Sequence, residues 1–232
     1  MFNIFKKRSD YKIINYSNLE ELKKIYDDVW KDERFPEKQW NRVEKQLKNV
    51  DEIPEFRAII ECIKATELKN PSILDVGCSS GYLSEVLKIK KIRAKYEGTD
   101  YSPSFINFAR NKYPKETFSV NDATNLKYKD KNFDIVVSAC CLLHIINYKK
   151  AISEAARVAK KYVIFHRTPV YSIRPTTFFT KTAYNAEMLE IIFNEDELVD
   201  IFKKNNLSVV KIKTISSEEN TTIKNYLCLK GK

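Results

Sequence analysis

Three aspartates stand where an α/β protein would bind a nucleotide-like cofactor. Asp75 ends the first strand-length apolar run and is followed by a turn with Gly77 and Gly81, Asp100 ends a second run, and Asp122 follows a third. Glycines let a backbone approach a ligand closely, and the amides that begin the next helix face its polar groups. An acid about 20 residues after such a turn can accept hydrogen bonds from both ribose hydroxyls. Because ligands of open sheets bind beyond the carboxyl ends of the strands, we expect the three carboxylates to meet in one crevice.

Alternating strand-like and helical segments position these residues. After a helical pattern over residues 18–68, short apolar runs alternate with amphipathic segments, which is typical of a mostly parallel sheet covered on both faces. The strands are expected near residues 72–76, 95–100, 116–120, 133–138 and 161–167, and the helices near 80–90, 103–112 and 147–160. A C-terminal helix, capped by Asn194 with Glu197, precedes two β-rich runs at 207–215 and 221–229 that should form a hairpin.

Composition indicates one domain without a dividing linker in the 232 residues. Lys and Arg total 41 against 31 Asp and Glu, a formal charge of +10. The lysines are scattered, and a general bias toward Lys, Ile and Asn accounts for the charge without nucleic acid. Attraction for an anionic substrate stays open.

The cysteines and histidines make no convincing metal set, and no metal is expected. The five cysteines form no C-x-x-C pair, and His144 and His166 are the only histidines. The N-terminus lacks the apolar stretch of a signal peptide, and no run is long enough to span a bilayer. We expect reduced thiols and a cytoplasmic protein.

Four motifs in order resemble those of the class I S-adenosylmethionine-dependent methyltransferases. They are ILDVGCSSGYL, YEGTDYSPSFINFAR, VNDATNL and FDIVVSACCLLHI, within residues 70–168. The resemblance implies a Rossmann-like α/β fold, with a seven-stranded, mostly parallel, doubly wound sheet whose last strand is reversed, and S-adenosyl-L-methionine as cofactor. It divides the chain into an N-terminal helical extension or lid, 1–68, and a methyltransferase core, 69–232, with a substrate-side insertion at 170–192.

The same resemblance implies the cofactor contacts, position by position. Those around the methionine part are Asp75, Gly77, Cys78, Gly81 and the Ser138 carbonyl, and those around the adenosine are Asp100 at the ribose with Tyr101, Asp122 and the Ala123 amide at the adenine. Asp100 has a second reading, which is to cap the helix expected from residue 103. The chain departs from the pattern at Ser79, where glycine is common, and at Cys140, where many relatives carry an acid. Serine should be tolerated if its backbone angles are ordinary, whereas Cys140 leaves the active-site chemistry open.

Methyl transfer to a hydroxyl needs a base, and the histidines are the candidates. His144 follows the fourth expected strand and His166 lies near the end of the fifth, both toward the ligand side. Imidazole titrates near neutrality, which suits proton removal from an attacking hydroxyl. Either histidine could instead be structural, satisfied by backbone groups.

Residues of the 170–192 insertion should determine which acceptor binds. Arg167, Arg174 and Tyr184 are the candidate contacts, and the two arginines could clamp a phosphate or carboxylate, although exposed arginine is the commoner outcome. This part of the chain also resembles uncharacterised methyltransferases of bacterial surface-polysaccharide gene clusters. That likeness implies O-methylation of a sugar or sugar nucleotide.

Other functions stay open. The charge prompts RNA methylation, but the segment after strand four lacks an Asn/Asp-Pro-Pro-aromatic motif. A non-catalytic binding subunit is possible, and a nicotinamide-dependent dehydrogenase would normally show G-x-G-x-x-G. In the N-terminal cover, Trp30, Phe35, Gln39 and Trp40 are candidate lid or substrate contacts, with plain packing as the alternative.

Overall fold

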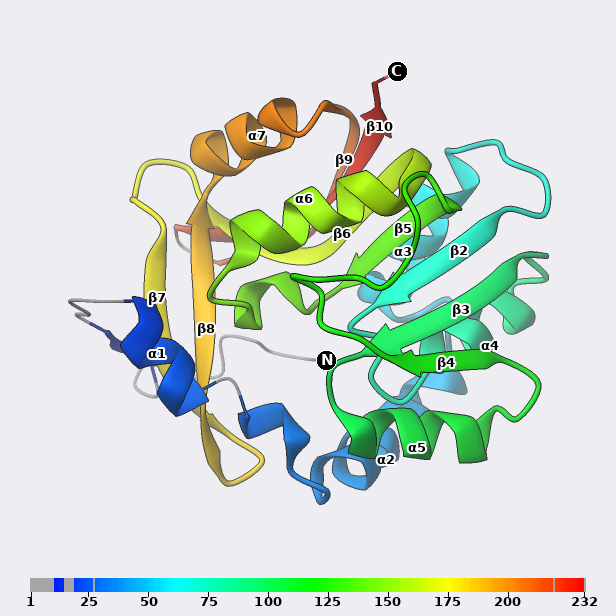
Figure 1. The fold of residues 1–232 in the computed structure, drawn as a ribbon, viewed down its shortest axis with the longest axis horizontal. Helices are drawn as coiled ribbons and strands as arrows, with labels where there is room; N and C mark the ends of the chain where they lie inside the picture. The colour runs from blue at the N-terminus through cyan, green and yellow to red at the C-terminus, as the bar shows by residue number, and fades with distance from the viewer. Residues whose placement is uncertain (1–10, 15–18, 27, 219, 232) are drawn as a thin grey trace.

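A twisted, mostly parallel sheet forms the centre of the molecule (Figure 1). The computed structural model describes residues 11–14, 19–26, 28–218 and 220–231. In this part of the chain, seven of the ten strands form the core of the sheet, in the order β4-β3-β2-β5-β6-β10-β9. Their bounds are β2 Ser72–Val76, β3 Lys95–Asp100, β4 Thr117–Val120, β5 Phe133–Ala139, β6 Ala159–Tyr171, β9 Leu207–Glu218 and β10 Thr221–Lys230. The first five run parallel, and β10 runs antiparallel between β6 and β9. The expected sheet with its reversed last strand and C-terminal hairpin is confirmed.

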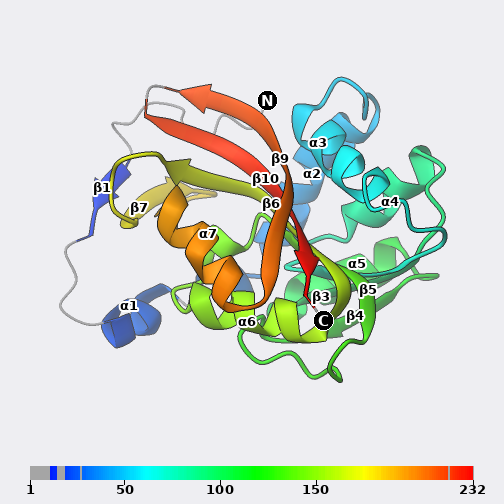
Figure 2. The same ribbon diagram turned by 90° about the horizontal axis from the view of Figure 1, so that it is seen from above.

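Helices cover both faces because successive side chains of a strand point to opposite sides. The helices are α2 Phe35–Leu47, α3 Pro54–Lys64, α4 Tyr82–Ile89, α5 Pro103–Lys112, α6 Tyr148–Val158 and α7 Glu195–Lys204. On β2, Leu74 and Val76 pack in the cluster under α6 and α7, whereas Ile73 packs in the cluster under α3 and α4. Figure 2 shows α6 and α7 on one side of the sheet and α2, α3 and α4 on the other. The cap expected for α7 is present, since the Asn194 side chain accepts a hydrogen bond from the Glu197 amide at 2.9 Å.

The insertion is a β-hairpin rather than an irregular segment. β6 continues four residues beyond the expected end at 167, and β7 (Thr177–Ala183) pairs antiparallel with β8 (Ala186–Asn194). β8 then joins the end of β6 in parallel. Tyr184 and Asn185 make the two-residue turn with φ of 54° and 63°, the left-handed geometry that suits a tight hairpin.

The N-terminal segments lie against this hairpin and against the core. The helices expected between residues 18 and 68 are present as α1 (Leu19–Tyr26), the short 3₁₀ helix η2 (Val29–Lys31), α2 and α3. An unexpected strand, β1 (Tyr11–Ile13), pairs with β7, and the Tyr26 hydroxyl of α1 donates to Glu187 of β8 at 2.9 Å. None of the described helices is long and apolar enough to cross a membrane.

Candidate active site

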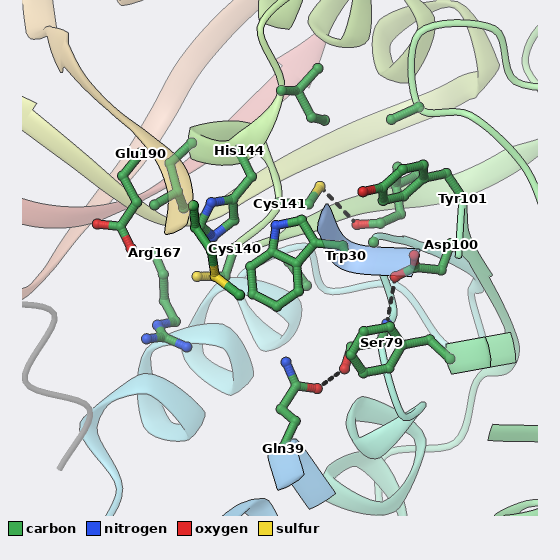
Figure 3. Close-up of a pocket in the computed structure, with 18 of the residues that line it drawn as sticks. Trp30, Gln39, Ser79, Asp100, Tyr101, Cys140, Cys141, His144, Arg167 and Glu190 are labelled. Atoms are coloured by element: carbon green, nitrogen blue, oxygen red, sulfur yellow. Dashed lines mark hydrogen bonds between the residues drawn. The ribbon is translucent and has the colours of Figure 1, made fainter. Parts of the chain in front are cut away.

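A cavity of about 420 Å³ lies beyond the carboxyl ends of β2, β3, β4 and β5. Its walls come from the strand ends, from the N-terminal segments and from the β7–β8 hairpin. Nine of the residues expected at the site line it: Gly77, Asp100, Tyr101, Asp122, Ala123, His144, His166, Arg167 and Tyr184. Five others do not: Asp75, Cys78, Gly81, Ser138 and Arg174. Figure 3 shows the cavity as two ends, with Asp100, Tyr101 and Ser79 at one and Arg167 and Glu190 at the other.

The glycine turn follows β2 and sits close against its neighbours. The amides of Gly77 and Cys78 both donate to the Thr99 carbonyl, at 2.8 and 3.0 Å. Gly77 and Gly81 have φ of 72° and 77°. A Cβ on Gly77 would lie 2.4 Å from the Cβ of Cys141, and one on Gly81 would lie 2.6 Å from the Phe118 ring. Only glycine fits these two positions, so the turn can lie close to a ligand.

Ser79 does not meet the condition of ordinary backbone angles under which serine would be tolerated easily. Its φ is 54°, in the left-handed region where serine is strained and glycine is not. Two contacts hold it there: its amide donates to the Asp100 carboxylate at 3.0 Å, and its hydroxyl donates to the side-chain oxygen of Gln39 on α2. The strained turn is therefore tied both to the next strand and to the N-terminal cover.

Asp100 ends β3 and lies at the cavity wall. One carboxylate oxygen accepts from the Ser79 amide and the other from the Ser102 amide, both at 3.0 Å. The second bond is a local turn contact just before α5, whose N-cap residue is Ser102 and has no side-chain cap, so the alternative role of Asp100 as a helix cap is not seen. Burial raises the pKa of Asp100 to about 6, partly offset by hydrogen bonds from the Ser102 and Ser79 amides.

Asp75 does not join the other two carboxylates, which corrects the expected convergence of three. β2 runs on to Val76, so the Asp75 side chain points to a face of the sheet and not beyond its edge. It is 1% exposed and accepts a hydrogen bond from the Tyr96 hydroxyl at 2.8 Å, while its Oδ1 has no hydrogen-bond partner. Burial, with a smaller contribution from the charge of Asp100, raises the pKa of Asp75 to about 7, although the hydrogen bond from Tyr96 acts in the opposite direction.

Asp122 and its neighbours line the cavity after β4. Asp122 is exposed, and its Oδ1 accepts from the amide and the hydroxyl of Thr124 at 2.7 and 2.8 Å. Asn121, which sequence reasoning did not single out, is 8% exposed and lines the same wall as Ala123. Asn121 could have been predicted as a cavity residue because it directly follows an expected strand.

The two histidines have different surroundings, although both line the cavity. His144, in the 3₁₀ helix η3 (Leu142–His144), donates from Nδ1 to the Leu189 carbonyl at 2.7 Å. A carbonyl only accepts, so Nδ1 carries the proton and Nε2 is left as an acceptor. Burial lowers the pKa of His144, so the ring is neutral at pH 7.

His166 fits the structural alternative. Its Nδ1 donates to the Asn225 side-chain oxygen at 2.9 Å, and the Arg167 amide donates to the same oxygen at 3.0 Å. Burial, together with the charge of Arg167, lowers the pKa of His166 to about 3. The ring is therefore a weak base that helps to fix the backbone of β6.

The end of the cavity away from Asp100 holds Arg167 and residues of the β7–β8 hairpin, but not Arg174. Arg174 is exposed in the connection between β6 and β7, with its guanidinium 5.7 Å from the Tyr171 ring. Arg174 therefore follows the commoner outcome, exposure, and the possible clamp of two arginines is not formed. Sequence reasoning missed Lys181 and Glu190, which line the cavity and form an ion pair at 3.4 Å. The alternation of apolar and polar residues along 177–194 was the signal for them.

Two of the four candidate cover residues line the cavity. Trp30 lies with its ring 4.9 Å from that of His144 and 6.2 Å from that of Tyr184, and Gln39 reaches Ser79. Phe35 is fully buried behind Trp30. Trp40 packs on Phe108 and under the Lys112 ammonium outside the cavity, so packing is its role.

The Asp100 end suits an adenosyl cofactor. It combines a turn in which two glycines leave no room for side chains, a carboxylate at the strand end, and a second carboxylate and an amide after the next strand. These groups can accept from ribose hydroxyls and an adenine amino group and donate to the adenine ring. Within the described residues, no cluster of three or more His, Cys, Asp or Glu side chains is arranged to hold a metal ion.

Comparison with known proteins finds similarity to methyltransferases. Residues 74–165 match the methyltransferase domain Methyltransf_11. The chain is 31% identical over 98 residues to the ubiquinone/menaquinone biosynthesis C-methyltransferase of Campylobacter jejuni, a match that spans 40% of this chain and only 42% of that protein. It is 29% identical over 217 residues to the ubiquinone biosynthesis O-methyltransferase of Pelagibacter ubique, covering 86% and 87% of the two chains.

Solved structures show the same fold. The crystal structure of Burkholderia thailandensis 1,6-didemethyltoxoflavin-N1-methyltransferase with bound 1,6-didemethyltoxoflavin and S-adenosylhomocysteine covers 96% of this chain and 95% of its own, with a TM-score of 0.66 at 12% identity. The methyltransferase match replaces the nicotinamide-dehydrogenase alternative. Residues 74–165 thus match a methyltransferase domain, and the fold is the one seen in an S-adenosylhomocysteine-bound methyltransferase, which supports S-adenosylmethionine as the cofactor.

Proposed function

We propose that the chain is an O-methyltransferase that acts on a hydroxyl group of a small polar acceptor. The observation that carries this proposal is His144, which lines the cavity as a neutral ring with Nδ1 bound to the Leu189 carbonyl. Among the described residues, no hydrogen bond joins Nε2 to another group. A base with an open lone pair in a cavity of this family is the group that an attacking hydroxyl requires.

In this proposal the strand ends hold the cofactor. Asp100 accepts from the ribose hydroxyls, Tyr101 and Asp122 flank the adenine, and the Ala123 amide donates to its ring. The turn from Gly77 lies along the methionine part, and Asp75, Cys78, Gly81 and the Ser138 carbonyl support it from behind. When bound, S-adenosylmethionine supplies a methyl group on a sulfonium sulfur, and in-line placement of the acceptor oxygen supplies much of the rate.

His144 removes the proton of the acceptor hydroxyl. Nε2 takes that proton as the oxygen attacks, and the Leu189 carbonyl keeps the ring in the required tautomer. The lowered pKa keeps Nε2 unprotonated at neutral pH. His166 has a positioning role instead, because its ring and the Arg167 amide share one Asn225 oxygen.

The favoured acceptor is a sugar or sugar nucleotide, as in surface-polysaccharide biosynthesis. The polar lining by Glu190, Lys181, Tyr184 and Asn147 supports it, because each can pair with hydroxyl groups. A second candidate is a phenolic hydroxyl on an aromatic ring. Two observations favour it: Trp30, Phe56 and Met188 also line the cavity, and the Pelagibacter relative that matches over most of its length is an O-methyltransferase.

The N-terminal segment, 1–68, acts as the cover of this site in our proposal. Its residues Trp30 and Gln39 reach His144 and the glycine turn, and the Lys31 ammonium lies 5.6 Å from the centre of the Tyr101 ring. A cover that contacts both ends of the cavity can exclude water from both reactants.

The test is a transfer assay with methyl-labelled S-adenosylmethionine and a panel of nucleotide sugars, sugar phosphates, catechols and RNA. We expect label in a small hydroxyl acceptor, and a loss of about 10²–10⁴ in kcat for His144→Gln. The affinity for S-adenosylhomocysteine, measured by calorimetry, should stay unchanged in that variant. His166→Gln is the matched comparison and should lower thermal stability more than the rate per folded molecule.

Each of the other possible assay results points to a different alternative. Absent cofactor binding would refute the whole function, and full activity of His144→Gln would refute the base. Cofactor binding without transfer to any acceptor would favour the binding-subunit alternative. Label in RNA, with RNA affinity that falls steeply with salt, would favour the RNA alternative.

A further inference from the structure

The end of the cavity away from Asp100 holds charged side chains that are almost fully buried. Arg167 on β6 and Glu190 on β8 are each 8% exposed, and they line this end with Lys181 and Glu55. In Figure 3, Arg167 and Glu190 lie on the opposite side of Trp30 from Asp100 and Tyr101. Removing such charges from water is costly, so this end suits a ligand with complementary polar groups.

The charged side chains at this end contact one another and several neutral groups. The Lys181 ammonium lies 3.4 Å from the Glu190 carboxylate, so these two largely cancel. Arg167 interacts electrostatically with Glu55, and also with Cys140, Tyr82 and Tyr184. Burial raises the pKa of the Cys140 thiol and of the two tyrosine hydroxyls, so these three groups are neutral at pH 7. Arg42 acts on the same Tyr184 and Glu55. Arg42 and Arg167 therefore share Glu55 and Tyr184 among their electrostatic contacts.

The backbone at Arg167 is strained and is held in place by a neighbouring strand. Its φ is 57°, a left-handed value within β6, which costs about 1–3 kcal/mol for a residue other than glycine. The Asn225 side chain holds this conformation by accepting from the Arg167 amide at 3.0 Å. Such strain is concentrated at ligand-binding sites, where the surrounding structure maintains it.

Arg167 is also within reach of the proposed base. Its charge contributes to lowering the pKa of His144, and Cys140 lies between Arg167 and His144 in Figure 3. A single small molecule can therefore contact both groups. The planar guanidinium offers paired donors that match the oxygens of a carboxylate or a phosphate.

We propose that the methyl acceptor carries an anionic oxygen group, a carboxylate or a phosphate, which Arg167 binds while the acceptor hydroxyl meets Nε2 of His144. This inference rests on the methyltransferase function proposed above and defines its substrate class. With the anionic group bound to Arg167, the acceptor hydroxyl is held at a fixed distance from Arg167 and next to Nε2 of His144. A neutral ring of the same shape lacks this anchor and binds more weakly.

The experiment measures binding, so that it does not depend on turnover. Protein saturated with S-adenosylhomocysteine is titrated by calorimetry with glucose, glucuronate and glucose 6-phosphate, and with catechol and 3,4-dihydroxybenzoate. The proteins are the wild type, Arg167→Gln, Arg167→Lys and the matched control Arg174→Gln, an exposed arginine outside the cavity. The comparison of sugar with aromatic rings, and of carboxylate with phosphate, shows which ring and which anionic group the site binds.

We expect an anionic member of at least one set to bind wild-type protein about tenfold or more tightly than its neutral counterpart, since a charge-assisted hydrogen bond contributes about 1.5–3 kcal/mol. Arg167→Gln should abolish this ratio, Arg167→Lys should restore part of it, and Arg174→Gln should leave it unchanged. Unchanged affinity for S-adenosylhomocysteine shows that each variant is folded.

Three results would overturn the inference: equal affinity for anionic and neutral members, a preference that survives in Arg167→Gln, or no binding of any anionic compound to wild-type protein. Failure of the methyltransferase function would be separate, because it would appear as absent binding of S-adenosylhomocysteine before any acceptor is added.

Discussion

At the Asp100 end of the cavity, the two carboxylates Asp100 and Asp122 stand within two residues of the strands that position them, whereas at the Arg167 end several residues come from distant segments. Asp100 ends β3 and Asp122 follows β4. Trp30 and Tyr184, by contrast, come from the N-terminal cover and from the turn of the inserted hairpin. One end is formed by backbone turns of the sheet, and the other by packing between separate elements.

This difference predicts two separable sets of effects. Changes at the Asp100 end should alter cofactor affinity or the stability of the sheet edge and leave acceptor binding intact. Changes at the Arg167 end should alter acceptor binding or turnover and leave cofactor affinity intact. Changes at Trp30 and Gln39 test whether the two ends behave independently, since the N-terminal cover contacts both ends.

The largest expected effect concerns Asp75, buried behind the Asp100 end. Its pKa is about 7 in the folded protein against 3.8 ordinarily, so folding favours the protonated form. The contribution of protonated Asp75 to the free energy of unfolding is fully present below pH 3.8 and is lost as the pH rises through about 7. Asp75→Asn cannot ionise, so its free energy of unfolding relative to wild type should rise by up to ~4 kcal/mol between pH 4 and pH 8.

Urea unfolding at several pH values measures this difference. Tyr96→Phe supplies the opposite control, because it removes the hydrogen bond that lowers the pKa of Asp75. Its stability should fall below that of wild type as the pH rises. Parallel pH curves for wild type and Asp75→Asn would show that Asp75 is not held in a buried, protonated state.

Asp100→Ala should weaken binding of S-adenosylhomocysteine about 100-fold, because it removes two charge-assisted hydrogen bonds of about 1.5–3 kcal/mol each that are partly replaced by water. The affinity of the wild type should also fall as the pH drops below about 6, where Asp100 becomes protonated. Calorimetry measures both. Asp122→Ala is the comparison at the same end and should cost less, since Asp122 is exposed. Equal losses in the two variants would mean that Asp100 does not hold the ribose.

Trp30→Phe tests the boundary between the two ends. Trp30 contacts His144 and Tyr184, so we expect a rise of about fivefold in the acceptor KM, in line with about 1 kcal/mol for an aromatic contact. Cofactor affinity should change little. Trp40→Phe is the matched control in the same segment, outside the cavity, and should lower the melting temperature without changing KM. The same KM change in both variants would assign Trp30 to packing alone.

Much of the Asp100 end was predictable because its signals are local. An acid at the end of an apolar run and two glycines after it are visible in the sequence, and the chain geometry of a parallel sheet brings them together. The strand expected near 72–76 is present, but Asp75 was treated as its last residue. Because Val76 follows Asp75 in the strand, alternation turns the carboxylate into the sheet face and onto Tyr96.

The Arg167 end could not be obtained in the same way. The turn of the inserted hairpin has no glycine, although Tyr184 and Asn185 both take positive φ, so the usual sequence signal of a tight turn is absent. The pairing of β8 with the end of β6, which places Glu190 and Lys181 in the cavity wall, depends on long-range packing. The different states of His144 and His166 depend on single partners, a carbonyl and an amide oxygen, that no spacing predicts.

The smallest expected effect is at Ser79, where strain and contact can be separated. Ser79→Gly and Ser79→Ala both lose the contact with Gln39, but only glycine relieves the left-handed φ of 54°. The glycine variant should therefore be more stable than the alanine variant by about 1 kcal/mol. Urea unfolding of the pair measures the strain, and cofactor affinity should follow the same order because this amide also donates to Asp100. Equal stabilities would mean that the turn relaxes when the serine is removed, and that the glycine-rich geometry of the Asp100 end is less rigid than its backbone contacts imply.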